Sequence, residues 1–139
     1  MTTIINANTS AGLTQTADTS GIVKLQSNGV TTNAIAWVNF AGASGTRNAS
    51  YNVSSVTRNA AGDYTITFTN ALTDANYSLC GMAVGYATGN PAGVCISLCG
   101  NSSYSAAPLG KTTSSVRVLS GTYAIATDSY EVSVNIFGN

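Results

Sequence analysis

The chain has 139 residues, which is enough for one domain with a buried core and leaves little room for a second. Charged residues make up only 7% of it, against roughly 25% in an average soluble domain. Because the five basic residues are scattered, and no stretch approaches the about 20 apolar residues of a membrane span, we expect neither nucleic-acid binding nor membrane insertion.

Residues 1–35 are polar and carry mostly small side chains, with only isolated apolar ones. Such a segment has too little apolar surface for a core of its own, so it needs a neighbour to become ordered. We predict an extended N-terminal docking arm over residues 1–35 and a head domain over residues 36–139. The side chains expected to dock the arm are Ile4, Ile5, Leu13, Ile22, Val23 and Leu25.

The head domain has a period of two in its apolar residues, which is typical of β-strands with one buried face. The clearest examples are residues 63–69, where large apolar side chains alternate with threonines, and residues 130–137. Many short strands separated by turns predict an all-β fold, an antiparallel β-sandwich of the jelly-roll-like kind. Further strands are predicted over residues 35–40, 51–57, 76–84, 93–98, 115–119 and 123–127.

The predicted core takes large apolar side chains from these strands. Trp37 is included because it lies in the apolar run of residues 35–40, where a large aromatic side chain is more often buried than exposed. The predicted core residues are Trp37, Phe40, Tyr64, Ile66, Phe68, Val132, Val134 and Ile136.

Two connections between strands carry distinct signals. Residues 59–63 are expected to close a tight hairpin, with Asn59 or Gly62 adopting a positive φ. Residues 85–93 are interpreted as a longer loop, since Pro91 cannot sit in a central ladder. Recognition is commonly carried by loops and by aromatic side chains, either as platforms for sugar rings or at protein interfaces. The candidate surface-binding residues are Tyr86, Asn90, Asn101 and Tyr104.

The sequence offers little for catalysis. It contains no histidine, which removes the commonest general base and metal ligand and excludes a Ser-His-Asp triad. Asp128 and Glu131 lie three positions apart near a predicted strand and would face opposite sides of it. A glycosidase pair could assemble from Asp63 or Asp74, although turns and strand ends already explain these aspartates. We expect a non-enzymatic protein with no catalytic residue, no cofactor and no metal site.

The three cysteines cannot complete a structural zinc site without histidine. Cys80, Cys95 and Cys99 are interpreted as small buried thiols in a reducing cytoplasm. A disulfide between Cys80 and Cys95 on neighbouring strands is the alternative.

The composition also bears on assembly. Monomeric β proteins commonly protect their sheet edges with lysine, proline or inward charges, and this chain has two lysines and two prolines. Charges are depleted at the centres of interfaces, as they are throughout this sequence. These features predict a homo-oligomer.

Two blocks of the sequence resemble a module that recurs in bacteriophage tail-fibre and related virion proteins. The first is residues 36–40 (AWVNF) followed by Gly42, and the second runs from residues 50–56 (SYNVSSV) through 62–68 (GDYTITF) to 74–77 (DANY). The opening of the chain also resembles the N-termini of cyanophage-type fibre and appendage proteins, in residues 4–7 (IINA), 12–13 (GL) and 18–21 (DTSG). The likeness extends more loosely to the closing residues 132–138.

This resemblance implies a virion-attached and usually trimeric β domain, assembled in the host cytoplasm and often concerned with host-surface contact. It supplies no catalytic residues. The partners it implies are further copies of the chain, other tail, neck or capsid proteins of the virion, and a host surface glycan or protein. The chain lacks the long repetitive shaft of typical members, so a capsid decoration protein is the alternative and a glycan-binding, lectin-like module a more remote one.

Overall fold

The computed structural model describes residues 25–27, 30–85, 95–98, 110–122 and 125–138 of the chain. Every regular element among them is a β-strand, and they contain no helix. The strands are β1 (Gln26–Ser27), β2 (Val30–Thr31), β3 (Ala36–Ala41), β4 (Arg47–Tyr51), β5 (Val53–Ala60), β6 (Asp63–Phe68), β7 (Ser78–Val84), β8 (Cys95–Leu98), β9 (Ser115–Thr122), β10 (Ile125–Ala126) and β11 (Glu131–Phe137).

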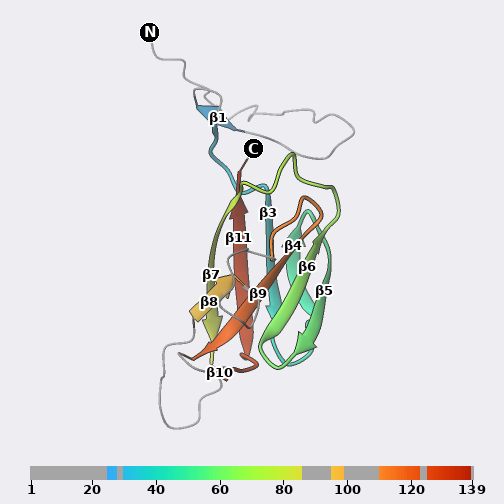
Figure 1. The fold of residues 1–139 in the computed structure, drawn as a ribbon, viewed down its shortest axis with the longest axis vertical. Coiled ribbons are helices and arrows are strands. Elements are labelled where there is room, and N and C mark those ends of the chain that lie inside the picture. Colours follow the sequence, from blue (N-terminus) through green and yellow to red (C-terminus); the bar gives the residue numbers. More distant parts are fainter. Residues whose placement is uncertain (1–24, 28–29, 86–94, 99–109, 123–124, 139) are drawn as a thin grey trace, which may run out of the picture.

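The described strands form two packed antiparallel sheets and a separate short hairpin of β1 and β2 (Figure 1). Sheet I has the strand order β4-β3-β11-β7. Sheet II has the order β10-β9-β6-β5, with β8 paired to the other edge of β9. At the centre of sheet I, β11 pairs in unbroken register with both β3 and β7. The predicted antiparallel β-sandwich is confirmed.

The core lies between the two sheets, where alternate residues of each strand point inward. Phe40 of sheet I meets Tyr64 of sheet II edge to face, with ring centroids 4.9 Å apart. Ile35, which comes just before the predicted start of the head domain, is also buried here. The buried apolar residues are Ile35, Ala36, Val38, Phe40, Val53, Tyr64, Ile66, Phe68, Leu72, Tyr77, Val116, Val118, Val132, Val134 and Ile136.

Trp37 lies outside this core, so its predicted burial is wrong. It is 36% exposed and points away from the sandwich, because β3 buries Ala36, Val38 and Phe40 and successive side chains of a strand face opposite sides. Trp37 and Phe40, three positions apart in a strand, cannot both face the core. The period-two pattern therefore placed the strand correctly, while residue size misplaced one member of it.

β4 and β5 are consecutive parts of one segment that bends at Asn52 and passes from sheet I to sheet II. Asn52 has a φ of 53°, a left-handed conformation that asparagine tolerates better than most residues. Its side-chain amide donates to the carbonyls of Ile35 and Asn70, both at 3.3 Å, and its Oδ1 accepts from the Asn70 N–H at 2.9 Å. These three hydrogen bonds fix the bend, which divides the strand predicted over residues 51–57 between β4 and β5.

The β5–β6 hairpin turns at residues 61–62, within the predicted turn of residues 59–63. Gly62 adopts the expected positive φ, at 68°. A Cβ atom at this position would lie 2.4 Å from the carbonyl oxygen of Ser120, so a side chain is excluded by space as well as by backbone conformation. The turn therefore packs directly against β9.

Candidate functional site

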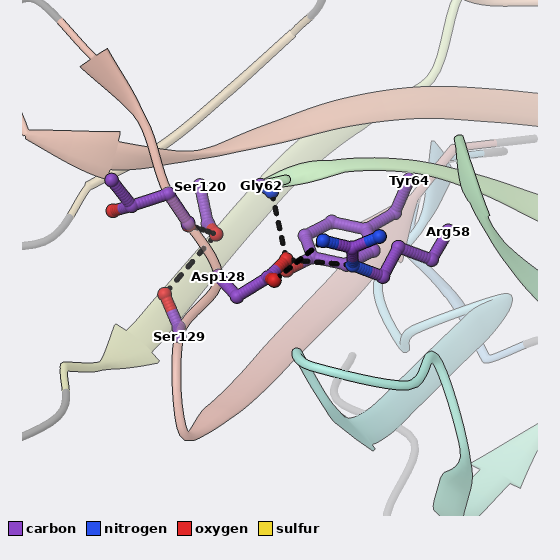
Figure 2. Close-up of polar contacts among 7 residues, drawn as sticks. Arg58, Gly62, Tyr64, Ser120, Asp128 and Ser129 are labelled. Carbon is purple, nitrogen blue, oxygen red and sulfur yellow. Dashed lines mark hydrogen bonds and ion pairs between the residues drawn. The ribbon is translucent and has the colours of Figure 1, made fainter. Parts of the chain in front are cut away.

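A dense group of polar contacts surrounds Asp128, near the β5–β6 turn (Figure 2). Its carboxylate accepts from Arg58 Nε at 2.9 Å and Nη2 at 2.7 Å, from the Gly62 N–H at 2.9 Å and from the Tyr64 hydroxyl at 3.2 Å. Asp128 lies just before β11 of sheet I, whereas its three donors come from sheet II and its β5–β6 turn. We call Arg58, Gly62, Tyr64 and Asp128 the Asp128 cluster; it joins the two sheets.

A pair of buried serines extends this cluster. Ser129 Oγ donates to Ser120 Oγ at 3.1 Å, and Ser120 Oγ donates to the carbonyl of Thr127 at 2.9 Å. The Ser120 N–H donates to Gly62 and its carbonyl accepts from Thr127, so the turn and the segment after β10 share one edge of β9. Each of these buried hydroxyls is therefore used within the fold.

The electrostatics of the Asp128 cluster suit a stable ion pair within the fold rather than a group that transfers protons. The hydrogen bonds from the Arg58 guanidinium hold the pKa of Asp128 below its ordinary value, against the opposing effect of burial. Burial raises the pKa of Tyr64, which stays a neutral donor. A carboxylate with a lowered pKa is a poor general acid near neutral pH. The arrangement therefore favours a role in holding the segment before β11 in place.

Asp63, one of the two aspartates considered for a glycosidase pair, is also bound by an arginine. Asp63 accepts from Arg117 Nε at 2.8 Å and from Arg117 Nη2, and from Asn59 Nδ2 at 3.1 Å. Arg117 lowers the pKa of Asp63. Asp74 instead accepts from the N–H of Asn76 at 2.6 Å, which is a local turn contact. Turns and strand ends account for both aspartates.

A third group of contacts surrounds Tyr77. Its ring meets Phe68 edge to face, with centroids 5.9 Å apart, and its hydroxyl lies 3.1 Å from the carbonyls of both Thr112 and Ser115. Lys111 donates to the Tyr77 carbonyl, and its Nζ lies 4.6 Å from the centre of the ring. Burial raises the pKa of Tyr77 to about 12. This group joins β7 to the segment that leads into β9.

The charges of the described residues are thus largely used inside the head. Arg47 donates to the carbonyl of Val53, across the bend at Asn52. With the pairs Arg58–Asp128 and Arg117–Asp63 and the contacts of Lys111 and Asp74, seven of the eight charged side chains in the described part of the chain have an internal partner. Glu131 is the exception.

The outer face of sheet I carries mostly uncharged side chains, several of them apolar and exposed. Cross-strand register places Trp37 beside Tyr51 of β4 and Asn135 of β11, which in turn faces Cys80 of β7. Met82 and Val84 continue the face along β7 and are 77% and 53% exposed. We call this surface the tryptophan face; its outward residues are Trp37, Asn39, Ala41, Ala49, Tyr51, Cys80, Met82, Val84, Glu131, Ser133, Asn135 and Phe137.

The outer face of sheet II carries mostly hydroxyl groups, with Leu119 as a large apolar side chain among its described outward residues. Thr57 of β5 lies opposite Thr65 of β6, and Thr65 lies opposite Arg117 of β9. The Arg117–Asp63 ion pair lies on the same face. We call this surface the hydroxyl face; its outward residues are Ser55, Thr57, Asp63, Thr65, Thr67, Ser115, Arg117 and Leu119.

Only some predicted site residues fall in the described part of the chain. Among the arm residues, Leu25 is 50% exposed and closes the β1–β2 hairpin, where its carbonyl accepts from Thr32 and its N–H donates to Asn33. The other arm residues and all four candidate surface-binding residues lie outside the described residues: Ile4, Ile5, Leu13, Ile22, Val23, Tyr86, Asn90, Asn101 and Tyr104.

The predicted burial of the cysteines is wrong for Cys80, which is a free and exposed thiol. It alternates outward on β7, opposite Asn135, because Leu79 and Ala83 occupy the inward positions. The side chain of Cys95 and all of Cys99 lie outside the described part of the structure. Exposure of Cys80 adds one more uncharged side chain to the tryptophan face.

The prediction from sequence missed Met82 and Val84, although β7 carries a signal. Its sequence, SLCGMAV, has apolar residues in both phases of the alternation, which is typical of strands covered on both faces. β3, with the sequence AWVNFA, has the same property. In this structure, the inward side chains of β3 are buried, whereas Cys80, Met82 and Val84 on the outer side of β7 are exposed.

Comparison with protein-family models, with curated proteins and with solved structures gives no match for this chain. Among the described residues, no group of three or more acidic, histidine or cysteine side chains could hold a metal ion. Nor does any helix in the described residues have the length and apolar character needed to cross a membrane. The function is therefore argued from the chain's own residues.

Proposed function

We propose that this chain is a non-enzymatic structural subunit of a bacteriophage particle, that it works as a homotrimer, and that residues 1–35 attach it to the virion. The tryptophan face carries this proposal, because a neutral surface with exposed Trp37, Met82 and Val84 is typical of an interaction site. The charged side chains support it, since they hold the head together and leave this face almost uncharged.

The assignment to a phage particle draws on the sequence resemblance in residues 1–80. Of the segments that carry it, those after residue 35 form β3, the bend at Asn52, the β5–β6 hairpin and the entry to β7, and those in residues 4–21 lie outside the described residues. In this proposal the head domain faces outward from the particle. Tyr86, Asn90, Asn101 and Tyr104 then contact a glycan or protein of the host surface.

Localisation in phage particles tests the proposal. A phage carrying an epitope tag after Asn139 is purified, and the tag is located by antibody labelling in electron micrographs. Label on the tail or neck is expected. Label on the head lattice would assign the decoration role instead, and absence of the chain from purified particles would overturn the proposal.

The role of the arm is tested in the same particles. A full-length Ile4→Asp, Ile5→Asp variant is compared with a Thr2→Asp, Thr3→Asp variant, which adds the same charge to neighbouring polar positions. We expect the first variant to be lost from particles and the second to be retained. Equal incorporation of both would contradict attachment through the arm's apolar residues.

A further inference from the structure

The tryptophan face is built like a surface that becomes covered. β3 and β7 carry apolar side chains in both phases of the alternation. One set faces the core, and the other set, which faces outward, includes Trp37, Cys80, Met82 and Val84. Strands of this kind are common where a second layer covers the outer side. The hydroxyl face, made from strands of similar length in the same chain, has threonines at the equivalent positions.

Three polar side chains on this face and at its β4 edge are already paired with one another. Asn48 Nδ2 donates to Asn39 Oδ1 at 2.8 Å, and Asn39 Nδ2 donates to Ser133 Oγ at 2.9 Å. This chain of hydrogen bonds runs across β4, β3 and β11. Burial of a polar group costs free energy mainly when its partners in water are not replaced. The row can therefore be covered at a smaller cost than unpaired amides would incur.

The charge of the face restricts its partner. Glu131 is the single charged side chain among the outward residues of the face, and it lies at one end between Ala41 and Val84. A strongly acidic partner would find no complementary charge there, and a strongly basic one would find Glu131 alone. A neutral, partly apolar surface fits, and the chain itself supplies one in this same face.

The size of the face sets the strength of such a contact. Four strands spaced about 4.8 Å apart, with five to seven residues of about 3.3 Å each, give a flat footprint of about 400 Å². Two footprints together give about 800 Å², and the relief of the side chains raises the accessible area above this value. Specific interfaces begin at about 1,200 Å², and smaller ones are typical of weak association. The face therefore fits a contact near the weak end of specific interfaces.

We infer that copies of this chain pack against one another through the tryptophan face, with Trp37, Met82 and Val84 at the contact. The inference rests on the proposed homo-oligomeric function and adds the surface and the partner. In the proposed homotrimer, this face of each of three copies meets the others around a threefold axis. The hydroxyl face then remains in contact with solvent.

A charge placed on each face tests the inference in the full-length protein. Met82→Glu puts a carboxylate on the tryptophan face in the edge strand β7, and Thr57→Glu does the same on the hydroxyl face in the edge strand β5. Both side chains are exposed, so neither change disturbs the core, and thermal unfolding checks this. Molar mass is measured by light scattering on a size-exclusion column over a range of micromolar concentrations.

We expect the wild type and Thr57→Glu to be oligomers, with about three times the 14.1 kDa mass of the chain for a trimer. Met82→Glu should weaken association about 100-fold or more, because the contact buries like charges near one another. Val84→Glu should act in the same way. A monomeric wild type, or Met82→Glu that associates as the wild type does, would overturn the inference.

Trp37 provides a second measurement, because it is the chain's single tryptophan and lies on the face itself. Its emission should shift to shorter wavelength as concentration rises in the wild type, and should stay at the monomer wavelength in Met82→Glu. Emission that does not change with concentration would count against the face even if oligomers form. A chain found in particles that still forms trimers when it carries Met82→Glu would leave the proposed function standing and remove this inference alone.

Discussion

The two outer faces of the sandwich are built by the same kind of strand and hold opposite kinds of side chain. On the hydroxyl face, Thr57, Thr65 and Thr67 stand beside the Arg117–Asp63 ion pair. On the tryptophan face, Trp37 and Met82 are exposed on a surface that carries almost no charge. The difference teaches that the described part of the chain uses its few charges to hold the head together and leaves one outer surface almost uncharged, as the proposed contact between copies requires.

The largest effect on folding is expected from Asp128→Ala. The substitution leaves the Arg58 guanidinium, the Gly62 N–H and the Tyr64 hydroxyl without their acceptor, which should cost about 3 kcal/mol in the free energy of unfolding. Asp74→Ala is the control, because Asp74 bonds only a nearby N–H, and should cost about 1 kcal/mol. Urea unfolding measures both. Equal losses in the free energy of unfolding would show that Asp128 does not stabilise the contact between the sheets more than an ordinary turn aspartate does.

The bend between the sheets is expected to come next. Asn52→Ala removes three hydrogen bonds and places alanine at a φ of 53°, and should cost about 2 kcal/mol. Asn52→Gly loses the same hydrogen bonds but accepts the backbone conformation, so it should cost less. Thermal unfolding of the two variants separates the terms. A glycine variant less stable than the alanine variant would contradict this assignment of strain.

Acid should weaken the Arg58–Asp128 and Arg117–Asp63 ion pairs. The folded-state pKa values of Asp63 and Asp128 are lowered, so their contribution is fully present above the unfolded value of about 3.9 and is lost as pH falls through the folded values. The urea midpoint should therefore be nearly constant from neutral pH to about pH 5 and then decline. The decline should be smaller in Asp128→Asn. A midpoint that stays constant into strong acid would contradict the role given to both pairs.

The smallest effect on folding is expected on the tryptophan face. Val84→Thr, which gives this face the chemistry of the other, should change the free energy of unfolding of the monomer by less than about 0.5 kcal/mol. Val132→Thr makes the same exchange at a fully buried position on the neighbouring strand and should cost about 2 kcal/mol. Unfolding at low protein concentration isolates the monomer. A large loss for Val84→Thr would mean that its side chain supports the head and is not available for contact.

Much of the fold is predictable because the apolar residues on the buried face of a strand recur at every second position. In β6, Tyr64, Ile66 and Phe68 alternate with polar residues, and only one orientation buries them. The β5–β6 turn followed from Gly62, since few residues accept its φ. The buried face of β3 was harder to predict because both alternating sets of its residues include apolar side chains. The large side chain of Trp37 favoured its burial, but the strand buries the set that contains Val38 and Phe40.

The contacts of the candidate site were beyond prediction because their partners are distant in the chain. Arg58 and Asp128 are separated by 70 residues, and Arg117 and Asp63 by 54. No local pattern marks a pair at such a distance; only the arrangement of the strands brings them together. The exposed side of β7 had a signal in its doubly apolar sequence, but that signal does not say which side the core takes.

The bend at Asn52 has a mechanical consequence. Because β4 and β5 are one covalent ribbon that belongs to both sheets, a load applied to sheet I is transmitted along the backbone into sheet II. Sliding of one sheet over the other would have to straighten Asn52 and break its hydrogen bonds to Ile35 and Asn70. The head should therefore resist shear as a single body when it is pulled through one face.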